Sequence, residues 1–288
     1  MIVPNGWEVQ TVEDTAKSDD LNTSVTNKQQ TGNLEIEKNW ENDTDSDRPK
    51  NLTIGLYRTT KVPASTAITP DLDYDDYSNY AKLLQYSLYF YDANMCGSQV
   101  GETSAYSWRD DCHTYNDVDG GFHDAGDHLM LGLPQGFTAS TLGWNYYEFK
   151  DAFDSLGQTE HYQTIMKYFC DFFVNSVHYN GNNVSEILVQ KGSESGNQRD
   201  HDYWGNPENQ TSENYGKETW MSSGASNIAA EYAAALASYA VNFPDDSNSA
   251  TYLNTAKALY EFSKKSDGVW NAEGLYSDKN CDDERAWA

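Results

Sequence analysis

The hydrophobic positions in the first 60 residues alternate with polar ones. Leu34 and Ile36 occupy alternate positions, and so do Ile54 and Leu56, a spacing that predicts half-buried β-strands. The stretch that follows, residues 61–72, holds two prolines among threonines and alanines, which is typical of a linker. We therefore predict a small β-rich segment over residues 1–60 and a linker over residues 61–72.

From residue 73 onward the hydrophobic period becomes helical. Tyr80, Leu84 and Leu88 fall on one face of a helix, as expected for an amphipathic segment. Later segments repeat this spacing, and they run over residues 137–149, 162–173, 228–243 and 252–262. Two long irregular stretches, 94–135 and 178–222, interrupt the pattern, and loops of such length are usually functional. The pattern predicts a mainly α protein, a helical barrel or bundle with its site at one rim.

The chain is strongly acidic. It has 45 aspartates and glutamates against 19 lysines and arginines, a net charge of -26 and a pI of about 4.3. This balance argues against nucleic acid and an anionic membrane surface as partners, whereas it is compatible with a neutral polysaccharide or calcium. No run of about 18 apolar residues is present, which predicts no membrane span. The first residues lack the basic head and apolar middle of a signal peptide.

Four side chains that bind soft or borderline metal ions lie in or near the first irregular stretch, and they are Cys96, Cys112, His113 and His123. Two cysteines and two histidines are a common tetrahedral zinc set, although this spacing matches no zinc finger. A disulfide between Cys96 and Cys112, with two unrelated histidines, explains the same residues equally well. If all four bind one ion, no coordination position stays open and the zinc is structural.

Two carboxylates, Asp124 and Asp127, are separated by two small residues in the same stretch. Glycosidases use two carboxyl groups, and two neighbouring acceptors can orient both protons of an attacking water. The alternative is an Asp-Ala-Gly-Asp turn that caps the next segment. In the second stretch, His201 and Trp204 offer hydrogen bonds and a stacking face to a sugar ring. The alternative is a tryptophan that packs this loop onto the protein body.

Two longer motifs surround these carboxylates. They read Gly-Gly-Phe-His-Asp-Ala-Gly-Asp-His at 120–128 and Gly-Leu-Pro-Gln-Gly-Phe-Thr-Ala-Ser at 132–140. The sequence here resembles the signature of family 9 glycoside hydrolases, and residues 89–94, 107–109 and 226–237 match as well. The resemblance implies that residues 73–288 form the N-terminal half of an (α/α)6 barrel. It also implies hydrolysis of β-1,4-glucosidic bonds in cellulose or related β-glucans with inversion.

The same resemblance implies roles for individual residues. Asp127 matches the general base, and Asp124 matches the second carboxylate that holds the attacking water. His201 and Trp204 match substrate-binding residues of the cleft. Tyr276 lies where the family has a cleft tyrosine, although the stretch that follows it is one residue short.

The resemblance also bears on metals. Members with a histidine directly before the aspartate motif, and with matching Cys and Cys-His upstream, bind a structural zinc, which favours zinc at Cys96, Cys112, His113 and His123. Asp283 and Glu284 match two ligands of a calcium site found in some members. Because the residues just before this pair depart from the pattern, we do not expect calcium.

The family's general acid, a glutamate near the end of the catalytic domain, has no counterpart in this chain. We therefore expect an incomplete, weakly active or inactive fragment. Residues 7–29 and 33–60 resemble parts of Cna B-type domains of bacterial surface proteins, a generic β-rich spacer being the alternative. These features predict a secreted or cell-surface bacterial protein with a polysaccharide substrate. Two other functions stay open: a non-catalytic surface or glycan-binding protein, and a hydrolase with a catalytic zinc.

Overall fold

The computed structural model describes residues 8–14, 23–28, 80–193, 200–211, 215–265, 267–272 and 275–288. The chain divides into two units, residues 1–59 and 60–288. In the first unit, strand β1 (Glu8–Asp14) pairs antiparallel with β2 (Thr23–Lys28), with Glu8 opposite Lys28. The strands expected over residues 34–56 and the linker at 61–72 lie outside the described residues.

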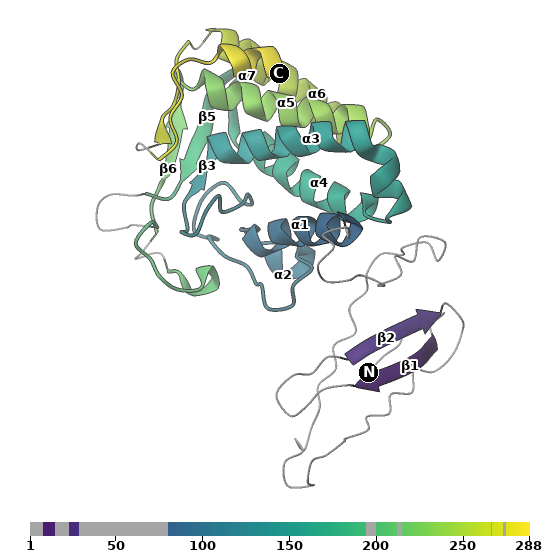
Figure 1. Cartoon of the computed structure of the whole chain (residues 1–288). Coiled ribbons are helices and arrows are strands. Elements are labelled where there is room, and N and C mark those ends of the chain that lie inside the picture. Colours follow the sequence, from purple (N-terminus) through teal and green to yellow (C-terminus); the bar gives the residue numbers. More distant parts are fainter. Residues whose placement is uncertain are drawn as a thin grey trace. The chain divides into compact units, whose positions relative to one another are not determined.

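The second unit is mainly helical (Figure 1). Its helices are α1 (Tyr80–Asn94), α2 (Val100–Thr103), α3 (Gly132–Ser155), α4 (Thr159–Asn175), α5 (Ser226–Asn242), α6 (Ser249–Lys265) and α7 (Asp282–Trp287). The segments with helical period lie on these helices, except that Phe243 lies one residue beyond α5. α3 begins earlier than predicted, because Pro134 is tolerated in a first turn, where the N–H has no helical partner. α5 ends at Asn242, two residues before Pro244, whose ring cannot continue a helix.

A small antiparallel sheet takes its strands from both of the stretches that were predicted to be irregular. Its central strand β5 (Asn183–Lys191) pairs with β3 (Met130–Leu131), β4 (Val177–Asn180) and β6 (Glu218–Met221). The last five residues of β5 are all buried, so the alternation that marks a half-buried strand is missing there. A 3-10 turn, η2 (Pro207–Asn209), lies between β5 and β6.

The core lies where α5 packs against both α3 and α6 (Figure 1). Stacked aromatic pairs fill it, such as Phe173 and Tyr232 with ring centroids 4.1 Å apart. α3 and α5 approach so closely that a Cβ atom added to Gly143 would lie 1.9 Å from Ser238 Oγ. Among the described helices, none combines the length and apolarity that a bilayer crossing requires.

Candidate active site and metal centre

Three segments converge on a cluster of sulfur and nitrogen ligands. Isolated antiparallel bridges join residues 95–97 to Cys112 and to Phe122. This pairing brings Cys96, Cys112 and His123 together, with one ligand atom of each lying within 4.8 Å of the others. All three are buried, and no other three His, Cys, Asp or Glu side chains among the described residues bring their ligand atoms so close. The structure thus assembles three of the four predicted zinc ligands.

The cluster suits a thiophilic metal ion. Cys96 and Cys112 are free thiols joined by a hydrogen bond, not a disulfide. Nε2 of His123 is buried and has no hydrogen-bond partner in the part of the chain that the structure describes, which is costly unless a ligand satisfies it. Burial, with the neighbouring His113 adding to it, holds the pKa of His123 well below its ordinary value. His123 is therefore in the neutral form that binds metals.

His113 stands beside this trio with its ring oriented by two acceptors. Its Nε2 lies 2.5 Å from Gln210 Oε1 and 3.4 Å from Asp200 Oδ1, so Nε2 carries the proton and donates. Nδ1 then holds the lone pair, 3.4 Å from Met130 Sδ. Metal-bound histidines commonly donate their second N–H to a carboxylate or carbonyl. His113 thus has the tautomer of a fourth ligand, although its nitrogen lies outside the group of three.

Two buried cations flank the thiols. Arg109 Nη2 lies 3.6 Å from Cys112 Sγ, and Arg109 Nε donates to Glu208 over 2.7 Å. Lys191 is fully buried, and its Nζ donates to Val118 O over 2.7 Å. Positive charges at these positions offset the negative charge of thiolates in a low-dielectric interior.

The two carboxylates of the Asp-Ala-Gly-Asp segment accept hydrogen bonds from the backbone that directly follows it. The Leu129 N–H donates to Asp127 Oδ1 over 3.0 Å, and the Leu131 N–H donates to Asp124 Oδ1 over 3.3 Å. Leu131 ends β3, just before α3. The turn interpretation and the catalytic interpretation are therefore compatible, because each carboxylate keeps an oxygen for another partner.

Side chains from two distant loops meet these carboxylates. His201 Nδ1 lies 2.5 Å from Asp127 Oδ2, and the Asp127 side chain is 17% exposed. The Tyr276 hydroxyl hydrogen-bonds to Asp124. Burial raises the pKa of Asp124 to about 6; the Tyr276 hydrogen bond opposes this rise, and the charge of Asp127 adds to it. Four of the five predicted cleft residues thus lie together.

Trp204, the fifth, is 94% exposed. It follows His201 by three residues on the same loop, and it does not pack that loop onto the protein body. A bare indole near a polar site offers an apolar face on which a pyranose ring can stack.

Sequence reasoning missed the residue that holds this loop. Asp200 is 0% exposed, and its Oδ2 accepts the N–H groups of Ser193 over 2.9 Å and Gly216 over 2.5 Å. Oδ1 accepts Gln210 Nε2 over 2.8 Å. Burial raises the pKa of Asp200, but hydrogen bonds from His113 and the two backbone N–H groups bring it below its ordinary value. The only sequence signal was its position next to His201.

Asp283 and Glu284 lie in the first turn of α7. Glu284 Oε2 is buried and has no hydrogen-bond partner within the described ranges. Burial raises the pKa of Glu284 to about 7, with the charges of Asp278 and Asp283 adding to the effect. Calcium takes roughly six to eight oxygen ligands, so this pair alone makes a poor site.

Comparison with known proteins shows the family to which this chain belongs. The sequence model of Glycosyl hydrolase family 9 matches residues 80–288, and the chain belongs to this family. Endoglucanase 2 from Arabidopsis thaliana is 30% identical in an alignment of 231 residues that covers 76% of this chain and 43% of that protein. Endoglucanase B from Cellulomonas fimi is 33% identical in an alignment of 201 residues that covers 67% of this chain and 18% of that protein.

Solved structures show the same relationship. The catalytic domain of Clostridium thermocellum CelT is 38% identical with a TM-score of 0.68, and the match covers 73% of this chain and 50% of that one. The cellulase Cel9M of C. cellulolyticum in complex with cellobiose is 40% identical with a TM-score of 0.65, covering 73% and 49%. The chain thus spans half or less of the relatives described here. The predicted mainly α fold, part of an (α/α)6 barrel, is confirmed.

Proposed function

We propose that this chain carries the general-base side of the active-site cleft in an inverting β-1,4-glucanase that acts on cellulose or a related β-glucan. The observation that carries the proposal is the Asp127 carboxylate, which is partly exposed and fixed by the Leu129 N–H and by His201. Family membership, relatives named endoglucanases and a relative crystallised with cellobiose support the substrate class.

In this proposal Asp127 accepts a proton from the water that attacks the anomeric carbon, on the face opposite the departing sugar. Asp124 is the second acceptor, and it orients that water while Tyr276 holds its carboxylate. His201 fixes the Asp127 carboxylate from the other side. The leaving oxygen takes its proton from a separate carboxylic acid, which belongs to the complete catalytic domain.

The metal has a structural role in this proposal. Cys96, Cys112, His113 and His123 would hold a zinc ion, which supplies a tetrahedral crosslink when bound and leaves no position for a hydrolytic water. Because His123 directly precedes Asp124, such a crosslink would fix the start of the aspartate turn. An insoluble polymer substrate agrees with a secreted or cell-surface location.

Sugar binding by this chain is tested by its tryptophan fluorescence during titration with cellotetraose. We expect a shift in the wild type and in Asp127→Asn, and its loss in Trp204→Ala. Trp108→Ala is the matched control, since Trp108 is also exposed, at 66%, on another loop. A signal that survives Trp204→Ala unchanged would contradict this role of the loop.

Catalysis is tested on a domain completed with the C-terminal half of CelT. Release of α-anomeric product from a β-glucan, followed by NMR, is the expected outcome. Retention of the β-anomer would refute the inverting assignment. Binding without hydrolysis in the completed domain would favour a non-catalytic glycan-binding protein, the alternative that the exposed Trp204 also supports.

A further inference from the structure

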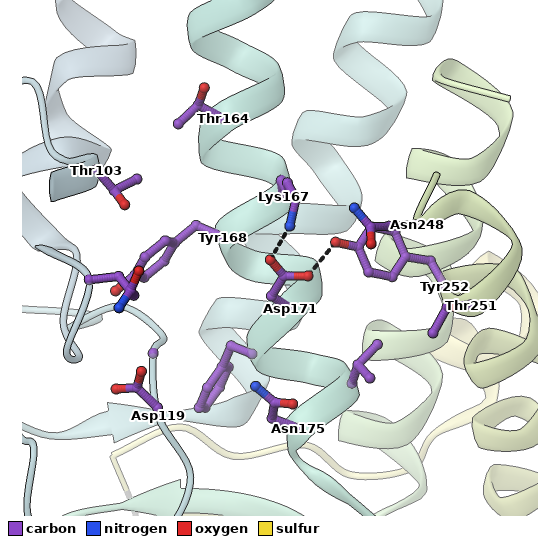
Figure 2. A pocket seen from close by; sticks show the side chains of 14 residues that line it. Thr103, Asp119, Thr164, Lys167, Tyr168, Asp171, Asn175, Asn248, Thr251 and Tyr252 are labelled. Atoms are coloured by element: carbon purple, nitrogen blue, oxygen red, sulfur yellow. Dashed lines mark hydrogen bonds and ion pairs between the residues drawn. The ribbon is translucent and has the colours of Figure 1, made fainter. Parts of the chain in front are cut away.

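A polar pocket lies apart from the candidate active site. Its volume is about 630 Å³, and its walls come from α2, α4, α6 and the turn at Asp119 and Gly120 (Figure 2). None of the five predicted cleft residues lines it. Its volume falls within the range of pockets that hold small ligands, and it exceeds the space that one pyranose ring fills.

Two hydrogen-bonded carboxylates hold the walls of this pocket. Asp171 on α4 accepts hydrogen bonds from Lys167 Nζ and, over 2.5 Å, from the Tyr252 hydroxyl on α6 (Figure 2). Asp119 accepts the Ser98 N–H over 2.7 Å and the Ser98 hydroxyl over 2.6 Å. The pocket is therefore built before any ligand arrives, which reduces the entropy cost of binding.

Four other polar side chains point to the ligand's chemistry. Thr103, Asn175, Asn248 and Thr251 line the pocket, and within the described residues their side chains have no hydrogen-bond partner. Two amides and two hydroxyls supply both donors and acceptors. A ligand with many hydroxyl groups on a compact frame matches this set.

Charge selects against other ligands. Lys167 is paired with Asp171, so no unpaired cation is left in the pocket to attract a phosphate or a carboxylate. Two carboxylates and a net charge of -26 repel anions. The carboxylates already accept N–H and O–H groups, and in the described chain they belong to no group that gathers metal ligands. A neutral, polyhydroxylated ligand remains.

We propose that this pocket is a second, non-catalytic sugar site that binds the end of a short gluco-oligosaccharide. Asn175 and Thr251 contact the sugar hydroxyls from α4 and α6. The choice of a glucose-based ligand rests on the proposed function, whereas the neutral polyhydroxyl chemistry rests on the pocket itself. Such a site would keep a glucan chain on the enzyme between encounters with the cleft.

The experiment is an NMR titration of the ¹⁵N-labelled chain with cellobiose, carried out on the wild type and in a Trp204→Ala background that weakens the cleft. We expect saturable amide shifts around Gln99, Asn175 and Thr251. The double variant Asn175→Ala/Thr251→Val should weaken this binding by about 10-fold, since each lost hydrogen bond is worth roughly 2- to 10-fold. Thr164→Val is the matched control, because the Thr164 hydroxyl on the same wall already donates to Glu160 O over 3.0 Å, and it should leave the affinity within about 2-fold.

The outcomes separate the two proposals. Shifts confined to the neighbourhood of Asp127 and His201, or shifts at the pocket that the double variant leaves unchanged, overturn the sugar pocket and leave the proposed function standing. Shifts at the pocket without any at the cleft in the wild type support the pocket and count against the proposed function. If the amide signals of all described residues stay unshifted, the proposal of a sugar pocket is overturned.

Discussion

Asp200→Asn tests whether the buried loop carboxylate sets the tautomer of His113. The substituted amide keeps its oxygen toward the N–H groups of Ser193 and Gly216, because both are donors. Its NH2 group then faces Gln210, whose side chain must turn its oxygen toward position 200. The Gln210 NH2 in turn meets His113 Nε2, so the His113 proton has to move to Nδ1. Nδ1 thereby loses the lone pair that a metal needs.

The size of the effect follows from the contacts. Replacing a charged acceptor by a neutral one at two backbone N–H groups costs about 1–3 kcal/mol of folding free energy. Loss of an outer partner of a metal-binding histidine typically weakens metal affinity about 10- to 100-fold. We therefore expect a lower urea midpoint and a zinc affinity reduced within that range.

Two measurements check this chain of events. Long-range ¹H–¹⁵N spectra of the metal-free chain report the His113 tautomer directly, and competition with a chromophoric chelator reports the zinc affinity. Asp117→Asn is the control, because Asp117 is an exposed carboxylate on the neighbouring loop. A variant at position 200 with the proton still on Nε2 of His113 and an unchanged zinc affinity would refute the reasoning.

Three further results are expected. The purified chain should contain one zinc per molecule and Cys112→Ser less than a tenth of that by elemental analysis; a metal-free chain with a Cys96–Cys112 disulfide would contradict this. Asp124→Asn should stabilise the chain at pH 8 by at most about 3 kcal/mol. Burial raises the pKa of Asp124 in the folded state to about 6, above its ordinary value, so ionisation of this carboxyl lowers the free energy of unfolding as the pH rises toward and through 6. Urea titrations at pH 4 and pH 8 check this, and a variant less stable than wild type at pH 8 counts against it. In the completed domain, Asp127→Asn should lower the hydrolysis rate about 10²- to 10⁴-fold and Asp124→Asn less; the reverse order would exchange their roles.

The helices were predictable because their apolar positions repeat with one period over several turns. α5 and α6 show this, and Pro244 marks the end of α5 in the sequence itself. β5 was not predictable in the same way. Its residues 187–191 are all buried although the last two are Gln and Lys, and the apolar run that remains, residues 187–189, is too short to show a period.

The residues of the candidate site also fall into two groups, those that the sequence predicted and those whose role arises only in the folded chain. Asp124 and Asp127 were predicted through a local motif, His201 through its place near Trp204 on a long loop, and Tyr276 only through the resemblance to the family. The contacts of His201 and Tyr276 with the two carboxylates depend on the folded chain. Asp200 was missed, because its role arises from hydrogen bonds to residues brought together from both sides of a loop. Sequence alone did not show that His113 lies outside the group of three ligand atoms. Its neighbour Cys112 belongs to that group, whereas Nε2 of His113 faces Gln210.

The contact between α3 and α5 restricts how this half-domain can be recombined. A Cβ atom at Gly136 would lie 2.7 Å from Glu231 Cβ, and one at Gly143 would lie 1.9 Å from Ser238 Oγ. A side chain larger than glycine at position 136 or 143 therefore requires a compensating change on α5. A chimera that takes the two helices from different parents inherits a clash wherever its α3 parent has a larger residue at position 136 or 143 and its α5 parent keeps Glu231 or Ser238. An exchange point between Asn242 and Ser249 keeps both helices from one parent and avoids this clash.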